Sequence, residues 1–238
     1  MGSDPRRRVQ SGRGEVFTGT WLFEDRTDAG RQLAETIAGE ETLADPLVVA
    51  LPRGGVPVAY EIAVRIGAPL DILIVRKIGA PGHAEFGLGA LVDGEEPELV
   101  LNRQAILLVR PAKGYVEAET GRQHAEILRR RALYFGDRQP LSPKDRDVIL
   151  VDDGIATGGT VRAAIKALRR AQPRRLLLAV PVAPKGELNE LRSCVDRIIC
   201  LATPAAFRAV GLHYRDFEQT SDEEVIALMK KARREDEA

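Results

Sequence analysis

The sequence of 238 residues has two cysteines, 5% aromatic residues and no formal net charge. Cys194 and Cys200 are too few for a disulfide framework and no signal peptide is visible, so we expect a reducing, cytoplasmic setting. Because basic and acidic residues balance, the protein has no net positive charge that would attract nucleic acid or a membrane surface. Any anion-binding site must therefore depend on a local group of residues. No apolar run approaches the ~20 residues that a bilayer-spanning helix needs. We therefore expect neither a membrane partner nor a specific nucleic-acid partner.

Two common phosphate-binding motifs are also missing. Gly154 and Gly159 have the spacing of a P-loop, but Thr160 and Val161 follow where that motif has lysine and then serine or threonine. The G-x-G-x-x-G pattern of dinucleotide-binding folds is absent from the whole chain. The first absence argues against a P-loop site, and the second argues against a nicotinamide or flavin enzyme.

The composition that is present, 44% hydrophobic and 29% charged residues, suits one globular α/β domain, which we expect to span residues 15–238. Residues 1–14 have little to bury and predict a mobile tail. We expect the arginines of this tail to be solvated, with contact to an acidic partner or a nucleic acid as the alternative.

Five short runs rich in β-branched residues predict the strands of this domain. They are continuously apolar rather than alternating, which is typical of strands buried on both faces of a parallel sheet. Helical patterns separate most of them, for example from Pro57 to Gly67 and from Val161 to Pro173. This alternation predicts a doubly wound, mainly parallel five-stranded sheet in the order 2-1-3-4-5. The runs are 46–51, 71–78, 147–153, 175–182 and 196–203.

The gap between the second and third strands, residues 79–146, is long for a compact domain. We expect it to hold an inserted glycine-rich loop, which would close over a ligand, and an exposed helix at Glu117–Tyr134. The core of the domain is then residues 45–205. The N- and C-terminal segments outside this core would form a hood.

Two acidic residues at the end of the third strand point to a site. In the stretch VILVDDGIATGGTV, residues 148–161, Asp152 and Asp153 follow a buried strand and precede a glycine- and threonine-rich turn that enters a helix. Adjacent carboxylates repel one another and need water, hydroxyl donors or a metal. The unpaired amides of such a turn and the helix dipole form an anion site, to which Thr157 and Thr160 add hydroxyl donors.

The predicted strand order brings a second loop to this site. In an open α/β sheet, ligands bind outside the carboxyl ends of the strands, at the point where the strand order reverses. Here that point lies between the first and third strands. The loops that follow them, PRGGV at 52–56 and DDGIATGGT at 152–160, would flank one crevice at the ~5 Å spacing of adjacent strands.

These motifs resemble those of a known family. The stretch VILVDDGIATGGTV resembles the binding motif of type I phosphoribosyltransferases, which use 5-phosphoribosyl 1-diphosphate (PRPP). PRGGV at 52–56 is similar to the diphosphate-binding loop of that family, and VRK at 75–77 is similar to a segment of its orotate and adenine enzymes. The whole chain is similar to a bacterial subgroup of predicted phosphoribosyltransferases with unassigned acceptor, in segments such as FEDRTDAGRQLA and VRKIGAPGHAEFGLGA. The resemblance implies Mg²⁺-dependent transfer of phosphoribosyl from PRPP to a nitrogenous acceptor, release of diphosphate, and a homodimer.

The resemblance also implies a role for each candidate residue. Asp152 and Asp153 would bind the ribose hydroxyls and lie near Mg²⁺, directly or through its waters. Lys77 would act on the departing diphosphate, so these three side chains are the candidate catalytic residues. The remaining candidates bind substrate: Arg53, Gly54, Gly55 and Arg76 at the diphosphate, and Ala156, Thr157, Gly158, Gly159 and Thr160 at the 5′-phosphate.

Two other interpretations stay open. A PRPP- or nucleotide-sensing protein would keep the same anion site without turnover, but it has less need of Arg76, Lys77 and a glycine-rich lid that excludes water. An α/β phosphatase or nucleotide hydrolase needs a nucleophile, and none is evident near the turn. The acceptor is not identified, because Ala156 stands where enzymes acting on 6-oxopurines place an aspartate. Phe207, Tyr214 and Phe217 would either stack on an aromatic base or form the core of the hood.

Overall fold

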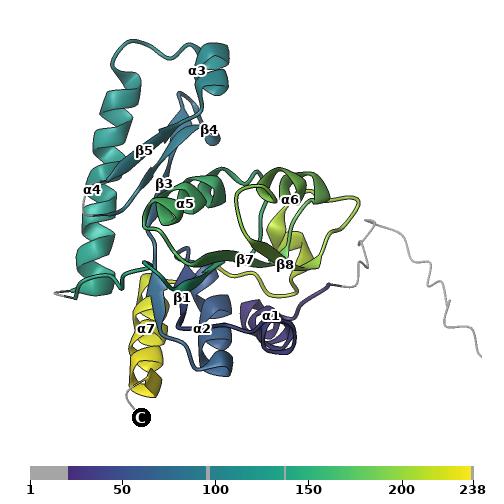
Figure 1. The fold of residues 1–238 in the computed structure, drawn as a ribbon. Helices are drawn as coiled ribbons and strands as arrows, with labels where there is room; N and C mark the ends of the chain where they lie inside the picture. Colours follow the sequence, from purple (N-terminus) through teal and green to yellow (C-terminus); the bar gives the residue numbers. More distant parts are fainter. Residues whose placement is uncertain (1–20, 95–96, 137, 237–238) are drawn as a thin grey trace, which may run out of the picture.

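A computed structural model describes residues 21–236, apart from 95–96 and 137. The expected tail at 1–14 lies outside the described residues. Figure 1 shows a main sheet with helices on both faces and, to one side, an arm that carries a second sheet together with α3 (Arg103–Val109) and α4 (Tyr115–Phe135). None of the described helices combines the length and the apolar character that crossing a membrane requires.

The main sheet has five parallel strands, as the apolar runs predict. Its order, β2-β1-β6-β7-β8, is the predicted 2-1-3-4-5, and the order therefore reverses between β1 and β6. The prediction of a doubly wound α/β fold is confirmed. The strands are β1 (Pro46–Ala50), β2 (Leu70–Ile72), β6 (Asp147–Val151), β7 (Arg175–Val182) and β8 (Arg197–Ala202).

Helices cover both faces of this sheet, and alternate residues of each strand are buried in two separate apolar clusters. One cluster lies under α1 (Arg26–Glu40), α2 (Gly55–Ile66) and α7 (Asp222–Asp236). The other lies under α5 (Gly159–Arg170) and α6 (Lys185–Leu191). Because both faces of the sheet are covered, the sequences of its strands are continuously apolar rather than alternating.

The helix ends follow from local sequence. Gly67, with a φ of 61°, ends α2 in the left-handed region that glycine adopts without a steric penalty. The Asp25 side chain accepts the N–H of Asp28 at 2.7 Å and so caps α1. Such caps satisfy N–H groups that have no partner within the helix.

The second predicted strand is where the structure departs from the prediction. The apolar run at 71–78 is divided between two sheets: β2 is the edge strand of the main sheet, whereas β3 (Val75–Ala80) begins an antiparallel sheet of order β3-β4-β5. β4 (His83–Val92) and β5 (Glu98–Leu101) complete that sheet. The glycine-rich segment that was expected to be a loop is therefore largely a β-hairpin, and the prediction of one strand at 71–78 is wrong.

Close strand packing explains one glycine of this hairpin, Gly89. A Cβ atom at Gly89 would lie 2.5 Å from the carbonyl oxygen of Val100 on the neighbouring strand β5. Glycine here permits two strands to approach rather than making the chain flexible. The arm also contains α3 (Arg103–Val109) and α4 (Tyr115–Phe135), and α4 includes the helix predicted at 117–134.

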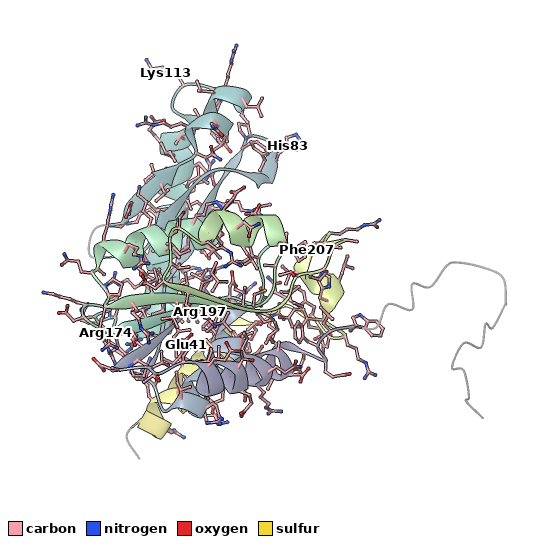
Figure 2. All side chains as sticks on the ribbon, turned by 45° about the vertical axis from the view of Figure 1, so that its right-hand side comes forward. Glu41, His83, Lys113, Arg174, Arg197 and Phe207 are labelled. Atoms are coloured by element: carbon pink, nitrogen blue, oxygen red, sulfur yellow. The ribbon has the colours of Figure 1, made fainter. Side chains whose placement is uncertain are left out.

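A buried carboxylate holds the amino-terminal end of β6. The Asp147 side chain is fully buried and accepts hydrogen bonds from Arg174 at 2.8 Å, from Arg175 at 2.7 Å and from the N–H of Ala44 at 3.1 Å. Burial by itself would raise the pKa of Asp147, but the hydrogen bonds from Arg175, Arg174 and Ala44 lower it to about 2. Figure 2 shows Arg174 at the end of the sheet opposite to Phe207. Asp147 therefore stabilises the fold at a distance from the loops that follow β1 and β6.

Asparagine at position 147 should destabilise the protein by about 2 kcal/mol at neutral pH. Because the folded-state pKa is depressed, this stabilisation is present above the unfolded-state pKa of ~3.9 and is lost as the pH falls towards 2. Urea unfolding of the wild type and of Asp147→Asn should differ at neutral pH and converge in acid. Asp45→Asn, which removes an exposed partner of Arg146, should change stability by less than about 0.5 kcal/mol. Equal losses in the two variants would contradict the assignment.

Candidate functional site

The loops that follow β1 and β6 lie against each other at the carboxyl end of the main sheet. Leu51 donates its N–H to the carbonyl of Val151 at 2.9 Å, where the two strands end. A Cβ atom at Gly54 in the first loop would lie 2.0 Å from Oδ2 of Asp153 in the second. The two predicted anion loops therefore flank one crevice, as the strand order predicts.

The two glycines of the first loop differ in what they contact. Gly55 donates its N–H to the carbonyl of Leu51 at 3.1 Å, so this amide is used inside its own loop and does not face a ligand. A Cβ atom at Gly55 would also lie 2.8 Å from the carbonyl oxygen of Val151, so Gly55 lets the loop pack on β6. Gly54 instead borders the acidic pair. The peptide bond between Pro52 and Arg53 is cis.

The turn at residues 154–160 leads from β6 into α5 and leaves its amides open. Ile155 donates its N–H to the carbonyl of Val182 at 2.9 Å and so anchors the turn to β7. Gly158 precedes α5 with a φ of 65°, and a Cβ atom there would lie 2.8 Å from Oε2 of Glu187. None of the N–H groups of residues 156–160 donates a hydrogen bond to another described residue. Open amides at a helix start are the donors that a phosphate needs.

Asp152 and Asp153 are partly buried beside this turn. Oδ1 of Asp152 accepts the backbone N–H of Asp153 at 2.9 Å. Burial raises the pKa of Asp152 well above its usual range, and the neighbouring carboxylate of Asp153 raises it further. Burial also raises the pKa of Asp153, although the guanidinium of Arg26 opposes this effect. The pair is thus a concentration of negative charge that a cation or hydroxyl donors would stabilise.

Arg26, the first residue of α1, is a site residue that sequence analysis does not assign. Its Nε donates to Oδ2 of Asp153 at 2.8 Å and its Nη1 donates to the carbonyl of Glu218 at 2.7 Å. Its guanidinium carbon lies 3.8 Å from the centroid of the Phe217 ring. The N-terminal segment therefore supplies a counter-charge for the acidic pair. The sequence feature that could have pointed to Arg26 is the segment FEDRTDAGRQLA. This segment supports the family resemblance, but it does not indicate what any of its residues does.

A cleft of about 450 Å³ opens beside Asp153, and we call it the arginine cleft. Arg130 reaches it from α4 with a side chain that is 12% exposed, although the polar pattern of this helix predicts an exposed element. Gathered guanidinium groups favour a ligand with several negative charges. The lining consists of four arginines, Arg26, Arg53, Arg76 and Arg130, together with Gly54, Asp153, Val210, Phe217, Gln219 and Thr220.

Arg76 and Lys77 lie on β3 of the arm rather than at the end of a main-sheet strand. Arg76 lines the arginine cleft and also a second cavity of about 490 Å³ between the β3–β4 hairpin and α4. Lys77 lines only the second of these two cavities, with His83 and Glu119. The structure therefore brings Arg76 together with Arg53 and Asp153, and it places Lys77 next to that group.

The aromatic residues of the C-terminal segment are mainly core. Tyr214 is buried, donates its hydroxyl to the carbonyl of Asp153 at 2.6 Å, and has its ring centroid 5.2 Å from that of Phe23. Phe207 packs against His213 next to the short helix η1 (Val210–His213). Among these predicted candidates, Phe217 lines the arginine cleft, where Arg26 covers its ring. Tyr214 thus supports the acidic pair from behind.

The acidic pair fits a metal only in part. In the described portion of the chain, no group of three or more histidine, cysteine or acidic side chains is arranged to hold a metal ion. Two adjacent carboxylates suit Mg²⁺, which keeps several waters and shares substrate phosphate oxygens rather than needing a cage made of protein ligands. Asp152 and Asp153 are therefore the residues that fit this ion.

Comparisons with known proteins agree with this geometry. The family model for the phosphoribosyl transferase domain matches residues 24–216. The Mycobacterium tuberculosis H37Rv protein named "Putative phosphoribosyl transferase Rv0571c" is 42% identical over 214 residues, which are 90% of this chain and 48% of that protein. This chain thus spans about half the length of the curated relatives that it matches. The crystal structure of TT1426 from Thermus thermophilus shows 43% identity and a TM-score of 0.73 over 88% of this chain and 98% of that one.

The matched region contains both loops of the crevice and all four arginines of the cleft. The fold, the acidic pair with its open turn and the family match are therefore consistent with one another. On this basis the chain belongs to the phosphoribosyl transferase domain family.

Proposed function

We propose that this protein is a Mg²⁺-dependent phosphoribosyltransferase that transfers the 5-phosphoribosyl group of PRPP to a nitrogenous base or related acceptor. The observation that carries the proposal is the open amide turn at 156–160, joined to the arginine cleft through Asp152 and Asp153. A phosphate fits the turn and a diphosphate fits the arginines. The span between them is occupied by carboxylates, which accept hydrogen bonds from ribose hydroxyls.

Each end of PRPP has a distinct set of donors in this proposal. The 5′-phosphate accepts hydrogen bonds from the amides of residues 156–160 and from the hydroxyls of Thr157 and Thr160. The diphosphate accepts hydrogen bonds from the guanidinium groups that line the arginine cleft, with Arg53 and Arg76 as the predicted ligands and Arg130 added by the structure.

The reaction replaces the bond between the anomeric carbon and a diphosphate oxygen with a bond to the acceptor nitrogen. The electron pair of the broken bond leaves with the diphosphate, whose negative charge rises as the ribosyl group gains oxocarbenium character. Arg53, Arg76 and Arg130 stabilise that rising charge, because they are held near it before the reaction starts. Bound Mg²⁺ supplies further neutralisation of the diphosphate charge, and Asp152 and Asp153 are the residues that would hold it.

Incubation with PRPP, Mg²⁺ and a panel of purine, pyrimidine and other nitrogenous acceptors tests this function. Diphosphate release that depends on one acceptor would establish the activity and name the acceptor. Tight PRPP binding without release across the panel would favour the alternative, a PRPP- or nucleotide-sensing protein on the same fold. Absence of PRPP binding would contradict both.

Alanine at Lys77 should slow diphosphate release more than it weakens PRPP binding. Because Lys77 lines the cavity next to the arginine cleft, we expect about a tenfold fall in kcat and less than about a threefold change in the Kd for PRPP. Arg76→Ala is the matched comparison. It removes a charged donor from the cleft itself and should raise the Kd at least about tenfold. Unchanged kcat in Lys77→Ala would remove Lys77 from the mechanism.

A further inference from the structure

Three of the four arginines of the arginine cleft are held by side chains that lead back to one helix, α4. This helix lies in the segment inserted between β5 and β6 and forms one side of the arm (Figure 1). Its sequence is polar, and by pattern alone it is expected to be a solvated helix. Its side chains, however, make specific contacts with arginines that line the cleft.

Arg76 is held directly by α4. Its Nε donates to Oε1 of Gln123 at 2.9 Å, and Nε2 of Gln123 in turn donates to Oε1 of Glu119 at 2.7 Å. Gln123 lies between an arginine and a carboxylate, so its amide orientation is fixed, with the oxygen towards Arg76. This chain of hydrogen bonds determines where the guanidinium of Arg76 points.

Arg130 belongs to α4 and is held by a carboxylate one turn earlier. Its Nε donates to Oε1 of Glu126 at 2.7 Å, while Arg129 donates to Oε2 of the same carboxylate at 2.8 Å. Hydrogen bonds from Arg129 and Arg130 lower the pKa of Glu126 to about 2, so this carboxylate is ionised at neutral pH.

Arg53 is held by α4 through one intermediate residue. Its Nη1 lies 3.6 Å from Oδ1 of Asp222, the first residue of α7. Tyr134 of α4 donates its hydroxyl to the same oxygen at 2.5 Å, and Nη2 of Arg129 lies 3.4 Å from the other oxygen of this carboxylate. Asp222 therefore links the diphosphate loop, α4 and α7.

Such holding is needed because the cleft concentrates positive charge. Burial lowers the pKa of Arg76, and the nearby charge of Arg130 lowers it further. Without fixed partners, like-charged guanidinium groups would separate and turn to solvent, and a polyanion would have to reassemble them on binding.

We propose that α4 positions the arginines of this cleft for a diphosphate group, with Gln123, Glu126 and Asp222 as positioning residues. The inference rests on the proposed function, because it takes the diphosphate of PRPP as the group that the cleft binds. These three side chains contact the arginines without lining the arginine cleft themselves. They are not catalytic residues, since each acts through an arginine.

The direction in which diphosphate affinity changes when Asp222 is neutralised distinguishes a positioning role from a purely electrostatic one. Asp222 carries a negative charge next to Arg53, so removing that charge should tighten binding of an anion if charge alone matters. If Asp222 positions Arg53, the same change should weaken binding, because Arg53 then loses its fixed geometry. Gln123 provides a second distinction. Alanine at this position removes the acceptor for Arg76, whereas exchanging Gln123 and Glu119 keeps that acceptor, keeps a donor facing it and leaves the net charge unchanged.

The experiment measures the affinity of inorganic diphosphate and of ribose 5-phosphate for the full chain by calorimetry. The variants are Gln123→Ala, the exchange variant Glu119→Gln with Gln123→Glu, and Asp222→Asn, with Glu117→Gln as the control, because Glu117 is an exposed carboxylate of α4 that does not line the cleft. We expect Gln123→Ala and Asp222→Asn each to weaken diphosphate binding about five- to tenfold. The exchange variant should restore most of the loss that Gln123→Ala causes, and Glu117→Gln should change nothing.

Ribose 5-phosphate distinguishes positioning from general damage. It binds at the 156–160 turn, so its affinity should stay within about twofold in every variant, whereas a misfolded variant would lose both ligands. If the wild type binds diphosphate and Gln123→Ala and Asp222→Asn bind it equally well or more tightly, the positioning role is wrong while the proposed function stands. If the wild type binds neither diphosphate nor ribose 5-phosphate, both are wrong.

Discussion

Alanine at Gly54 should reduce PRPP affinity roughly 100-fold or more while leaving the fold intact. The added Cβ atom would lie 2.0 Å from Oδ2 of Asp153, so the carboxylate must rotate away. That rotation breaks the 2.8 Å hydrogen bond from Arg26 and removes an acceptor from the ribose hydroxyls. The backbone at Gly54 is in the right-handed helical region, so alanine strains no dihedral angle there. The loss should therefore be large in calorimetric PRPP binding, whereas thermal stability should fall only by the contribution of the broken Arg26–Asp153 ion pair.

Two other glycines provide matched controls for this prediction. At Gly55 the added Cβ atom would meet backbone, the carbonyl oxygen of Val151 at 2.8 Å, so Gly55→Ala should lower thermal stability as well as binding. At Gly39, within α1, it would meet nothing within 4 Å, so Gly39→Ala should leave PRPP binding unchanged and should not lower thermal stability. Normal PRPP affinity in Gly54→Ala would show that the position of Asp153 does not matter for the ligand.

Replacing both Asp152 and Asp153 by asparagine should abolish the Mg²⁺-dependent part of PRPP binding. Hydrogen bonds to charged acceptors contribute about 1.5–3 kcal/mol each, so the loss of two predicts a Kd at least about 100-fold higher. Asparagine has nearly the same shape, and Tyr214 donates to the backbone carbonyl of Asp153 rather than to its side chain, so the loop geometry should persist. Titration of PRPP with and without Mg²⁺ measures the effect.

Asp216→Asn is the control for this double variant. Asp216 is an exposed carboxylate two residues after Tyr214, and it does not line the arginine cleft. Its replacement should leave the Kd for PRPP unchanged at every Mg²⁺ concentration. A double variant that binds PRPP as the wild type does, with the same response to Mg²⁺, would remove the acidic pair from its assigned roles.

The sequence predicts the main sheet well because that part of the fold depends on local pattern. Strands buried on both faces leave continuous apolar runs, and the helices between them leave helical periodicity, so the doubly wound class follows. The strand order comes instead from the arrangement common to such sheets, and the crevice between 52–56 and 152–160 follows from that order. The open turn at 156–160 is predictable for the same reason, since its glycines and threonines are contiguous with the strand and helix that present them.

The arm was not predictable in the same way. The run at 71–78 does not show that the chain leaves one sheet after Ile72 and enters another at Val75, because no glycine or proline marks a break between the two strands. Glycine has two uses, in loops and where strands approach closely, and only the 2.5 Å distance from a Cβ at Gly89 to the Val100 carbonyl distinguishes them here.

The cationic side of the site depends on contacts between distant segments. Arg26 meets Asp153 across 127 positions of sequence, and Arg130 reaches the cleft from a helix whose pattern is that of a solvated surface. These arginines lie far along the chain from the loops with which they line the cleft, so no sequence motif contains both. The order of VRK at 75–77 also does not determine which of its two basic residues enters the cleft, and the structure selects Arg76.

The central claim is that a sugar phosphate docks its phosphate on the amides of residues 156–160. The most direct measurement is a titration of the ¹⁵N-labelled protein with ribose 5-phosphate, followed through the amide resonances of that turn, with ribose as the ligand that lacks the phosphate. The account predicts that the amide protons of 156–160 shift downfield with ribose 5-phosphate and stay in place with ribose. Resonances of the turn that do not move with ribose 5-phosphate would contradict it.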